Sequence, residues 1–91
     1  MEGREFFRMK QIARTPKQIG AIIRRARRNA RLTQTELGKR IGLRQATISR
    51  IEKGEDETNL STLLDALTAL GLEIIIDKRG RASGKDLEDL F

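Results

Sequence analysis

The sequence predicts an all-α fold, a compact domain of four or five short helices followed by one C-terminal β-strand. Apolar residues recur at helical spacing in several separate stretches, and Gly42, Gly54 and Gly71 each follow one of them. The 91 residues are 37% hydrophobic but only 3% aromatic. A core made of Leu, Ile and Ala suits packed helices better than a β-sandwich.

The first helix is expected over residues 16–29. Thr15 is a good N-cap, and Pro16 suits the first helical position, where its missing N–H costs no hydrogen bond. The apolar stripe consists of Ile19, Ile22, Ile23, Ala26 and Ala30. Three cations lie outside this stripe, namely Arg24, Arg25 and Arg28. We expect them to provide a solvated field that attracts polyanions, with direct phosphate contact as the alternative.

The middle of the chain is predicted to form two short helices joined by a glycine turn, a helix-turn-helix. Thr33 can cap the first of them, and Glu36, three residues later, completes a capping box. Gly42 is expected to end it in the left-handed conformation that glycine adopts most easily. The second helix fits residues 45–53.

The second of these helices has two unlike faces. Thr47, Ile48 and Ile51 share one side. The other side and the residue before the helix carry the candidate contacts to DNA bases: Arg44, Gln45, Ala46, Ser49 and Arg50. Glutamine can bond adenine, alanine can touch a thymine methyl, and arginine can reach guanine or a phosphate. For Gln45 and Ser49, ordinary polarity of a helix surface is the alternative.

Thr33 and Gln34 are candidate phosphate contacts, because main-chain N–H groups at a helix N-terminus attract anions and the Gln34 amide can donate. The role of Thr33 as a cap accounts for it equally well. The charge distribution agrees with a polyanion partner. Residues 1–54 contain 15 Lys or Arg against 4 acids, a net +11, whereas residues 55–91 contain 4 against 9, a net −5.

A further helix is expected over residues 60–70, ending at Gly71. Its apolar stripe consists of Leu60, Leu63, Leu64, Leu67 and Leu70. We expect this stripe to close the core over Leu37, Ile41, Leu43, Ile48 and Ile51. Any apolar surface left over would be a dimer contact.

Residues 72–77 are predicted to form a strand, because Leu72 is followed by three consecutive isoleucines, Ile74, Ile75 and Ile76. A single strand in a helical chain leaves backbone N–H and C=O groups unpaired, so it needs a partner. We expect its copy in a second chain, in an antiparallel pair across a two-fold axis. Pairing with residues 9–13 of the same chain is the alternative.

These signals divide the chain into a basic arm (1–14), a helix-turn-helix domain (15–71), the strand (72–77) and a flexible tail (78–91). The apolar residues of the arm and tail could instead pack on a partner. The sequence contains no Cys and no His, so we expect no metal site, no cofactor and no catalytic residues. No apolar run approaches a membrane span, and a soluble cytoplasmic protein is expected.

The pattern T-Q-x-E-L-G-x-x-I-G-x-x-Q-x-x-I-S-x-x-E-x-G, at residues 33–54, resembles the helix-turn-helix family of lambdoid phage repressors, the XRE/Cro type. Within residues 10–79, R-Q-A-T-I-S at 44–49 and L-E-I-I-I-D at 72–77 are similar to HipB-type antitoxins. Two departures stand out. Many relatives have glycine where this chain has Arg31, and HipB-type chains end in tryptophan rather than phenylalanine. At the first departure, either Asn29 takes the left-handed conformation or the turn differs.

The resemblance implies several roles. A buried ion pair would join Arg27 to Glu52, and base contacts would come from Arg44, Gln45, Ala46 and Ser49. The protein would be a homodimer on a palindromic double-stranded DNA operator, repressing its own operon and neutralising a HipA-like kinase-fold toxin. Two alternatives stay open: a stand-alone phage-like or regulatory repressor without a toxin, and chiefly a toxin-binding interaction module.

Overall fold

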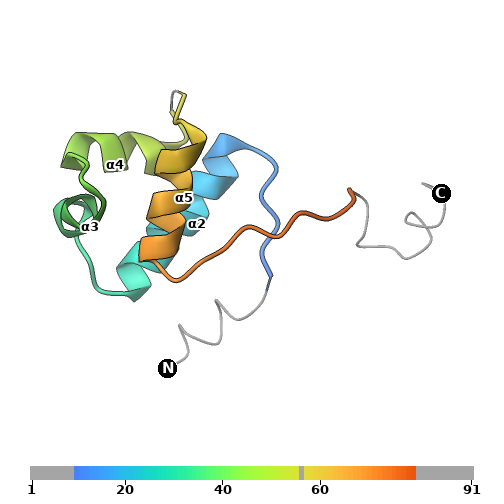
Figure 1. Cartoon of the computed structure of the whole chain (residues 1–91), viewed down its shortest axis with the longest axis horizontal. Helices are drawn as coiled ribbons and strands as arrows, with labels where there is room; N and C mark the ends of the chain where they lie inside the picture. Colours follow the sequence, from blue (N-terminus) through green and yellow to red (C-terminus); the bar gives the residue numbers. More distant parts are fainter. Residues whose placement is uncertain (1–9, 56, 80–91) are drawn as a thin grey trace.

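Four helices follow one another within residues 10–55 and 57–79, the part of the chain that this computed structural model describes (Figure 1). They are α2 (Pro16–Asn29), α3 (Gln34–Ile41), α4 (Gln45–Lys53) and α5 (Leu60–Ala69). The predicted all-α fold is confirmed, and the bounds match those expected from caps and glycines, with α5 one residue shorter. The predictions for residues 1–9 and 80–91 lie outside the described residues.

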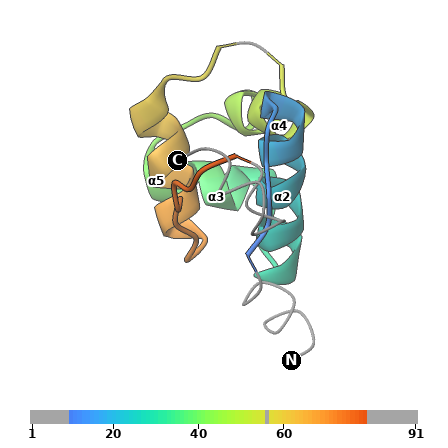
Figure 2. The same cartoon turned by 90° about the vertical axis from the view of Figure 1, so that its right-hand side faces the viewer.

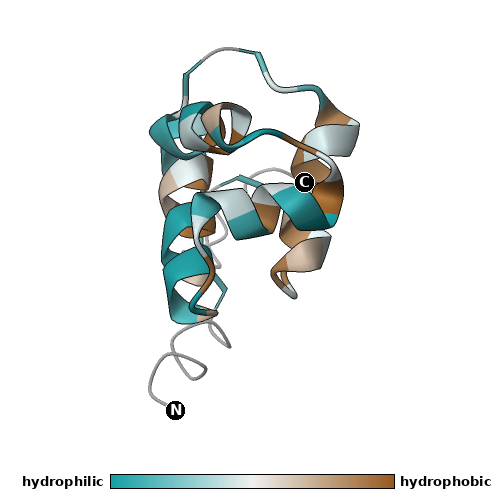
Figure 3. Ribbon diagram, turned by 90° about the vertical axis from the view of Figure 1, so that its left-hand side faces the viewer, coloured by the Kyte–Doolittle hydropathy of each residue, from teal (hydrophilic) through white to brown (hydrophobic). Residues whose placement is uncertain are grey.

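The helices pack around a small aliphatic core. Ile23 of α2, Leu37 of α3 and Ile48 of α4 are almost completely buried, and Ile51 and Leu67 complete the cluster. Figure 2 shows α2 and α5 side by side, with α3 between them and α4 against the upper end of α2. Hydrophobic residues gather on the inward sides of the helices, and α2 is hydrophilic along its outer side (Figure 3).

The leucine stripe of α5 is only partly core. Leu60 and Leu64 are 64% and 41% exposed, so the prediction that the whole stripe closes the core is wrong for these two. Ala66, outside the predicted stripe, is completely buried. The buried face of α5 is therefore rotated toward Ala66, which leaves Leu64 at its edge and Leu60 beyond the end of the core. The remaining leucines pack on the core as predicted: Leu63, Leu67 and Leu70.

Residues 72–79 leave α5 as a chain segment that runs away from the helices (Figure 1). The predicted strand forms no β-ladder within the described part of this single chain. No backbone hydrogen bond joins residues 10–13 to this segment, so the alternative of pairing within the chain is not realised in the described residues. Ile74, Ile75 and Ile76 are 47%, 55% and 92% exposed. Pairing with a second copy stays a prediction.

The end of α2 explains how the chain manages without glycine at position 31. Arg31 itself is left-handed, with φ of 60°, whereas Asn29 is the last helical residue. The N–H of Arg31 donates to the carbonyl of Arg28 at 3.0 Å, and that of Leu32 to the carbonyl of Arg27 at 3.1 Å. This is a Schellman turn, which normally uses glycine at the left-handed position. The possibility that Asn29 supplies the left-handed residue is therefore wrong.

A close approach between α2 and α4 depends on Gly20. A Cβ at this position would overlap the carbonyl oxygens of Ile51 and Glu52 in the last turn of α4. Because Gly20 has no side chain, the two helix backbones come close enough for Arg27 and Glu52 to meet. The sequence pattern did not single out Gly20, since nothing around it marks a turn.

Candidate nucleic-acid interface

The turn between α3 and α4 sets the angle at which α4 leaves the core. Gly42 is left-handed, with φ of 73°, and the N–H of Leu43 donates to the carbonyl of Gly38 at 2.8 Å. At the other end of α3 the predicted capping box is present, with Thr33 and Glu36 each accepting a hydrogen bond from the backbone of the other. The bond donated by the Thr33 backbone holds the pKa of the Glu36 carboxyl below its usual range.

α4 buries one face and exposes the other. Ile48 and Ile51 are buried and Thr47 is half-buried, as the helical wheel predicts. The candidate base contacts all have accessible side chains, with Ser49 half-buried and the other four exposed: Arg44, Gln45, Ala46 and Arg50. The structure therefore brings the predicted residues together on the outer side of α4 and at its N-terminus.

The N-terminus of α4 differs from those of the other three helices. Thr15, Thr33 and Asn59 cap α2, α3 and α5 with a side-chain oxygen. Arg44 holds the N-cap position of α4 and makes no side-chain capping bond. The first N–H groups of α4 are therefore uncapped by a side chain, and together with the Arg44 guanidinium they make this end attractive to a negatively charged ligand.

Arg27 and Glu52 form the ion pair that the resemblance implied. Arg27 Nε donates to Glu52 Oε2 at 2.6 Å, and Arg27 Nη2 donates to Oε1 at 3.0 Å. The two side chains are only 10% and 2% exposed. Arg27 Nη1 also donates to the carbonyl of Leu32 at 2.8 Å, just before α3. One guanidinium thus ties together α2, α4 and the entry to α3.

Gln34 extends this network to the surface of α4. Its Nε2 donates to Glu52 Oε1 at 3.0 Å, and its Oε1 accepts a hydrogen bond of 2.5 Å from Gln45 Nε2. The sequence predicts the Gln34 amide as a phosphate contact, but its oxygen and one of its N–H groups already form hydrogen bonds within the protein. The second hydrogen on Nε2 stays available to a phosphate. Spacing alone could not have found the link to Gln45, because the residues belong to different helices.

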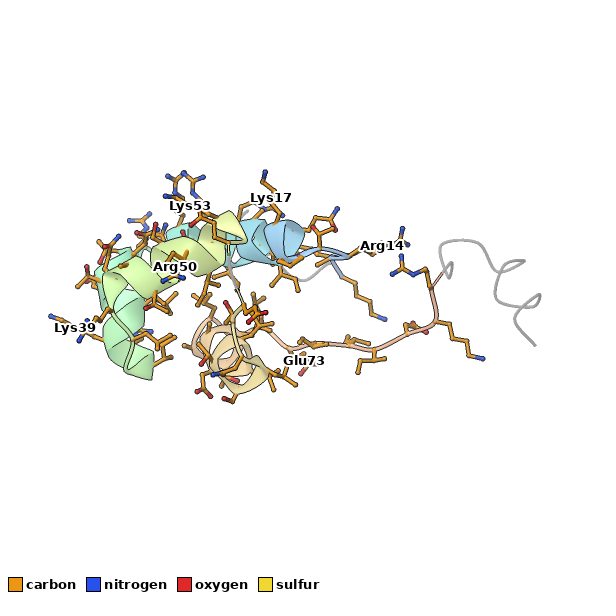
Figure 4. The ribbon with its side chains drawn as sticks, turned by 90° about the horizontal axis from the view of Figure 1, so that it is seen from above. Arg14, Lys17, Lys39, Arg50, Lys53 and Glu73 are labelled. Carbon is orange, nitrogen blue, oxygen red and sulfur yellow. The ribbon has the colours of Figure 1, made fainter. Side chains whose placement is uncertain are left out.

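A groove of about 550 Å³ runs between α2, the start of α3 and the outer face of α4. Cations dominate its charged lining, because the only acid, Glu52, is already paired with Arg27. Figure 4 shows Lys17, Lys39, Arg50 and Lys53 pointing outward from α2, α3 and α4, while Glu73 lies on the segment after α5. The lining residues are Arg24, Arg27, Arg28, Thr33, Gln34, Thr35, Gln45, Ser49, Glu52 and Lys53.

Other kinds of site are not found in the described residues. No group of three or more His, Cys, Asp or Glu side chains there could hold a metal ion. None of the described helices combines the length and apolar character needed to cross a bilayer.

Comparison with known proteins agrees with this geometry. A helix-turn-helix family model matches residues 23–75. The antitoxin HipB of Escherichia coli strain K12 is 35% identical over 74 residues, which are 81% of this chain and 84% of that protein. A solved HipB-O4 20mer complex superposes with a TM-score of 0.70 at 34% identity, over 77% of this chain and 99% of that chain. A solved HipA-HipB-O2-O3 complex also gives a TM-score of 0.70, with the same identity and coverage.

Proposed function

We propose that this chain, which belongs to the helix-turn-helix family and within it to the HipB family, is a sequence-specific DNA-binding repressor that acts as an antitoxin. We also propose that it is a non-catalytic protein. We further propose that it acts in the cytoplasm, at the nucleoid when bound to DNA.

One observation supports DNA binding most directly. The outer face of α4, with Gln45 and Ser49, opens onto the same basic groove as the N-terminus of α3. A duplex seated there would present base edges to α4 and phosphates to the groove. Arg44, at the uncapped start of α4, would reach guanine or a phosphate, and Ala46 would contact a thymine methyl.

The operator is proposed to be palindromic, because one α4 reads only a few base pairs and useful specificity needs a second copy. The exposed isoleucines of residues 72–77 could pack against their copies in a second protomer, in an antiparallel pair of β-strands. The distance between the two recognition helices, and hence the half-site spacing, would follow from that pairing.

The antitoxin role rests on the relatives. HipB of Escherichia coli is an antitoxin, and a structure of HipB in a complex with HipA has been solved. We propose that this chain binds a HipA-like kinase toxin and represses the operon that encodes both proteins. A stand-alone repressor is the second candidate, because DNA binding alone explains the basic groove and the outer face of α4, without a toxin.

Operator selection tests the central proposal. Purified protein would be offered a random duplex library, and the enriched sequences should contain two inverted half-sites. A Gln45→Ala variant should lose preference at one base position by roughly 1–3 kcal/mol, while a Thr68→Ala variant on exposed α5 surface should select the same sequence as wild type. Enrichment of no sequence would refute the proposal. Co-expression with the neighbouring gene product, followed by co-purification, separates the antitoxin from the stand-alone repressor.

A further inference from the structure

A row of cations on α2 extends beyond the groove described above, as far as Lys17 in the first turn of the helix. Lys17, Arg24 and Arg28 are exposed and follow one another at spacings of seven and four residues, which places them along one face of the helix. Ala21 lies between them on the same face. A second groove, of about 560 Å³, runs along this face and along the last turn of α4, where Lys53 lines it.

We call the groove formed by Lys17, Arg24, Arg28 and Lys53 the α2 trough. Among the described residues 10–55 and 57–79, none of these four cations forms an ion pair. The acids that line the trough are Glu52, already neutralised by Arg27, and Glu55. Cations held side by side with so little compensation favour a polyanionic ligand.

The trough is continuous with the groove described above, because Arg24, Arg28 and Lys53 line both. Its far end is at Lys17, in the first turn of α2, away from the N-terminus of α3. From Lys17 to Arg28 the helix rises roughly 16 Å at about 1.5 Å per residue. A DNA strand advances about 3.4 Å per phosphate along the helix axis, so the trough is long enough to follow several phosphates.

We propose that the α2 trough holds the sugar-phosphate backbone of the duplex outside the base pairs that α4 reads. This deepens the proposed function and rests on it. The small side chain of Ala21 leaves room for the backbone between the cations. With the trough, each protomer covers a longer segment of DNA. Because the trough makes no base contacts, the affinity it adds is independent of sequence and sensitive to salt.

The test compares two duplexes carrying the selected operator. One ends at the outermost specified base pairs, and the other extends at each end by about 10 base pairs of arbitrary sequence, roughly one helical turn. The trough variant is Lys17→Gln/Arg24→Gln. The matched control is Lys39→Gln/Arg40→Gln, which removes the same charge from exposed positions on α3. Thermal melts establish that both variants are folded, and dissociation constants are measured between about 50 and 200 mM salt.

Wild type is expected to show a steeper salt dependence on the extended duplex than on the short one. The trough variant should lose this difference. Its slope on the extended duplex should fall by about 0.9 for each phosphate contact removed, or about 3.6 for two cations in each of two protomers. The control should keep the wild-type difference. Equal slopes for wild type on the two duplexes, or equal effects of variant and control on the extended duplex, would overturn the proposal. Failure of wild type to select any operator would instead refute the proposed function.

Discussion

Gln45 of α4 donates a hydrogen bond of 2.5 Å to Gln34 of α3, and Gln34 in turn donates to the buried carboxylate of Glu52 at 3.0 Å. The Gln45 side chain, which is proposed to read a base, is therefore oriented by hydrogen bonds that lead through Gln34 to the buried Glu52. Orientation before binding reduces the entropy lost when the complex forms.

Gln34 should therefore affect sequence discrimination as well as affinity. We expect Gln34→Ala to weaken operator binding and also to reduce discrimination at the position read by Gln45, because Gln45 loses its support. The measurement is a double-mutant cycle with Gln34→Ala and Gln45→Ala, assayed on the operator and on a duplex changed at that base pair. The coupling on the operator should be about 0.5–3 kcal/mol. Strict additivity would show that Gln34 acts only as a phosphate contact.

The Arg27–Glu52 pair predicts unequal effects of two arginine substitutions in α2. Arg27→Ala should lower the free energy of unfolding by about 3–5 kcal/mol, because it leaves the buried Glu52 carboxylate without its partner. Arg24→Ala, at an exposed position, should change it by about 0.5 kcal/mol or less. Urea unfolding measures both. A double variant Arg27→Met/Glu52→Met should recover much of the loss, and equal midpoints for the two single variants would contradict the predicted role of the pair.

The left-handed Arg31 predicts a stabilising substitution. Three of the four described helices are followed by a left-handed glycine, at φ of 72° or 73°, whereas α2 is followed by Arg31, which adopts φ of 60° with a Cβ. Arg31→Gly should raise the free energy of unfolding by about 1 kcal/mol, since it removes the steric cost of that conformation. Asn29→Gly, at the last residue of α2, should instead lower it slightly, by about 0.3 kcal/mol. A destabilised Arg31→Gly protein in urea melts would contradict this account of the turn.

Arg44 predicts a conflict between stability and binding. Arg44→Ser would give α4 a side-chain N-cap, and the free energy of unfolding should rise by about 0.5–2 kcal/mol. The same change removes a cation from the proposed DNA-facing end, so operator affinity should fall. Calorimetry and a binding titration on the same protein test both effects. A protein that gains stability with unchanged affinity would remove Arg44 from the interface.

Gly20 predicts the reversal of an ordinary helix preference. Alanine is normally favoured over glycine inside a helix by about 1 kcal/mol. Gly20→Ala should nevertheless lower the free energy of unfolding by about 1–3 kcal/mol, because the added Cβ would overlap the last turn of α4. Ala21→Gly, its half-buried neighbour, should show the ordinary cost of about 1 kcal/mol. An increase in stability for Gly20→Ala would show that α2 and α4 can separate at little cost.

Local signals were enough to predict the helices. Thr15, Thr33 and the three left-handed glycines each act within a few residues of their own position, so caps and helix ends could be inferred without knowing the fold. The outer face of α4 followed from helical periodicity for the same reason. The Arg27–Glu52 pair, 25 residues apart in sequence, was reached through the family resemblance rather than through any local pattern.

The helices, the basic half of the chain and the face of α4 that carries Gln45 could therefore be predicted from local sequence patterns. The hydrogen bond between Gln45 and Gln34, the close contact at Gly20 and the buried face of α5 became visible only in the folded chain. Capping and periodicity depend on residues within one or two helical turns. These contacts arise only when helices distant in sequence pack and their side chains compete for the same space and hydrogen bonds.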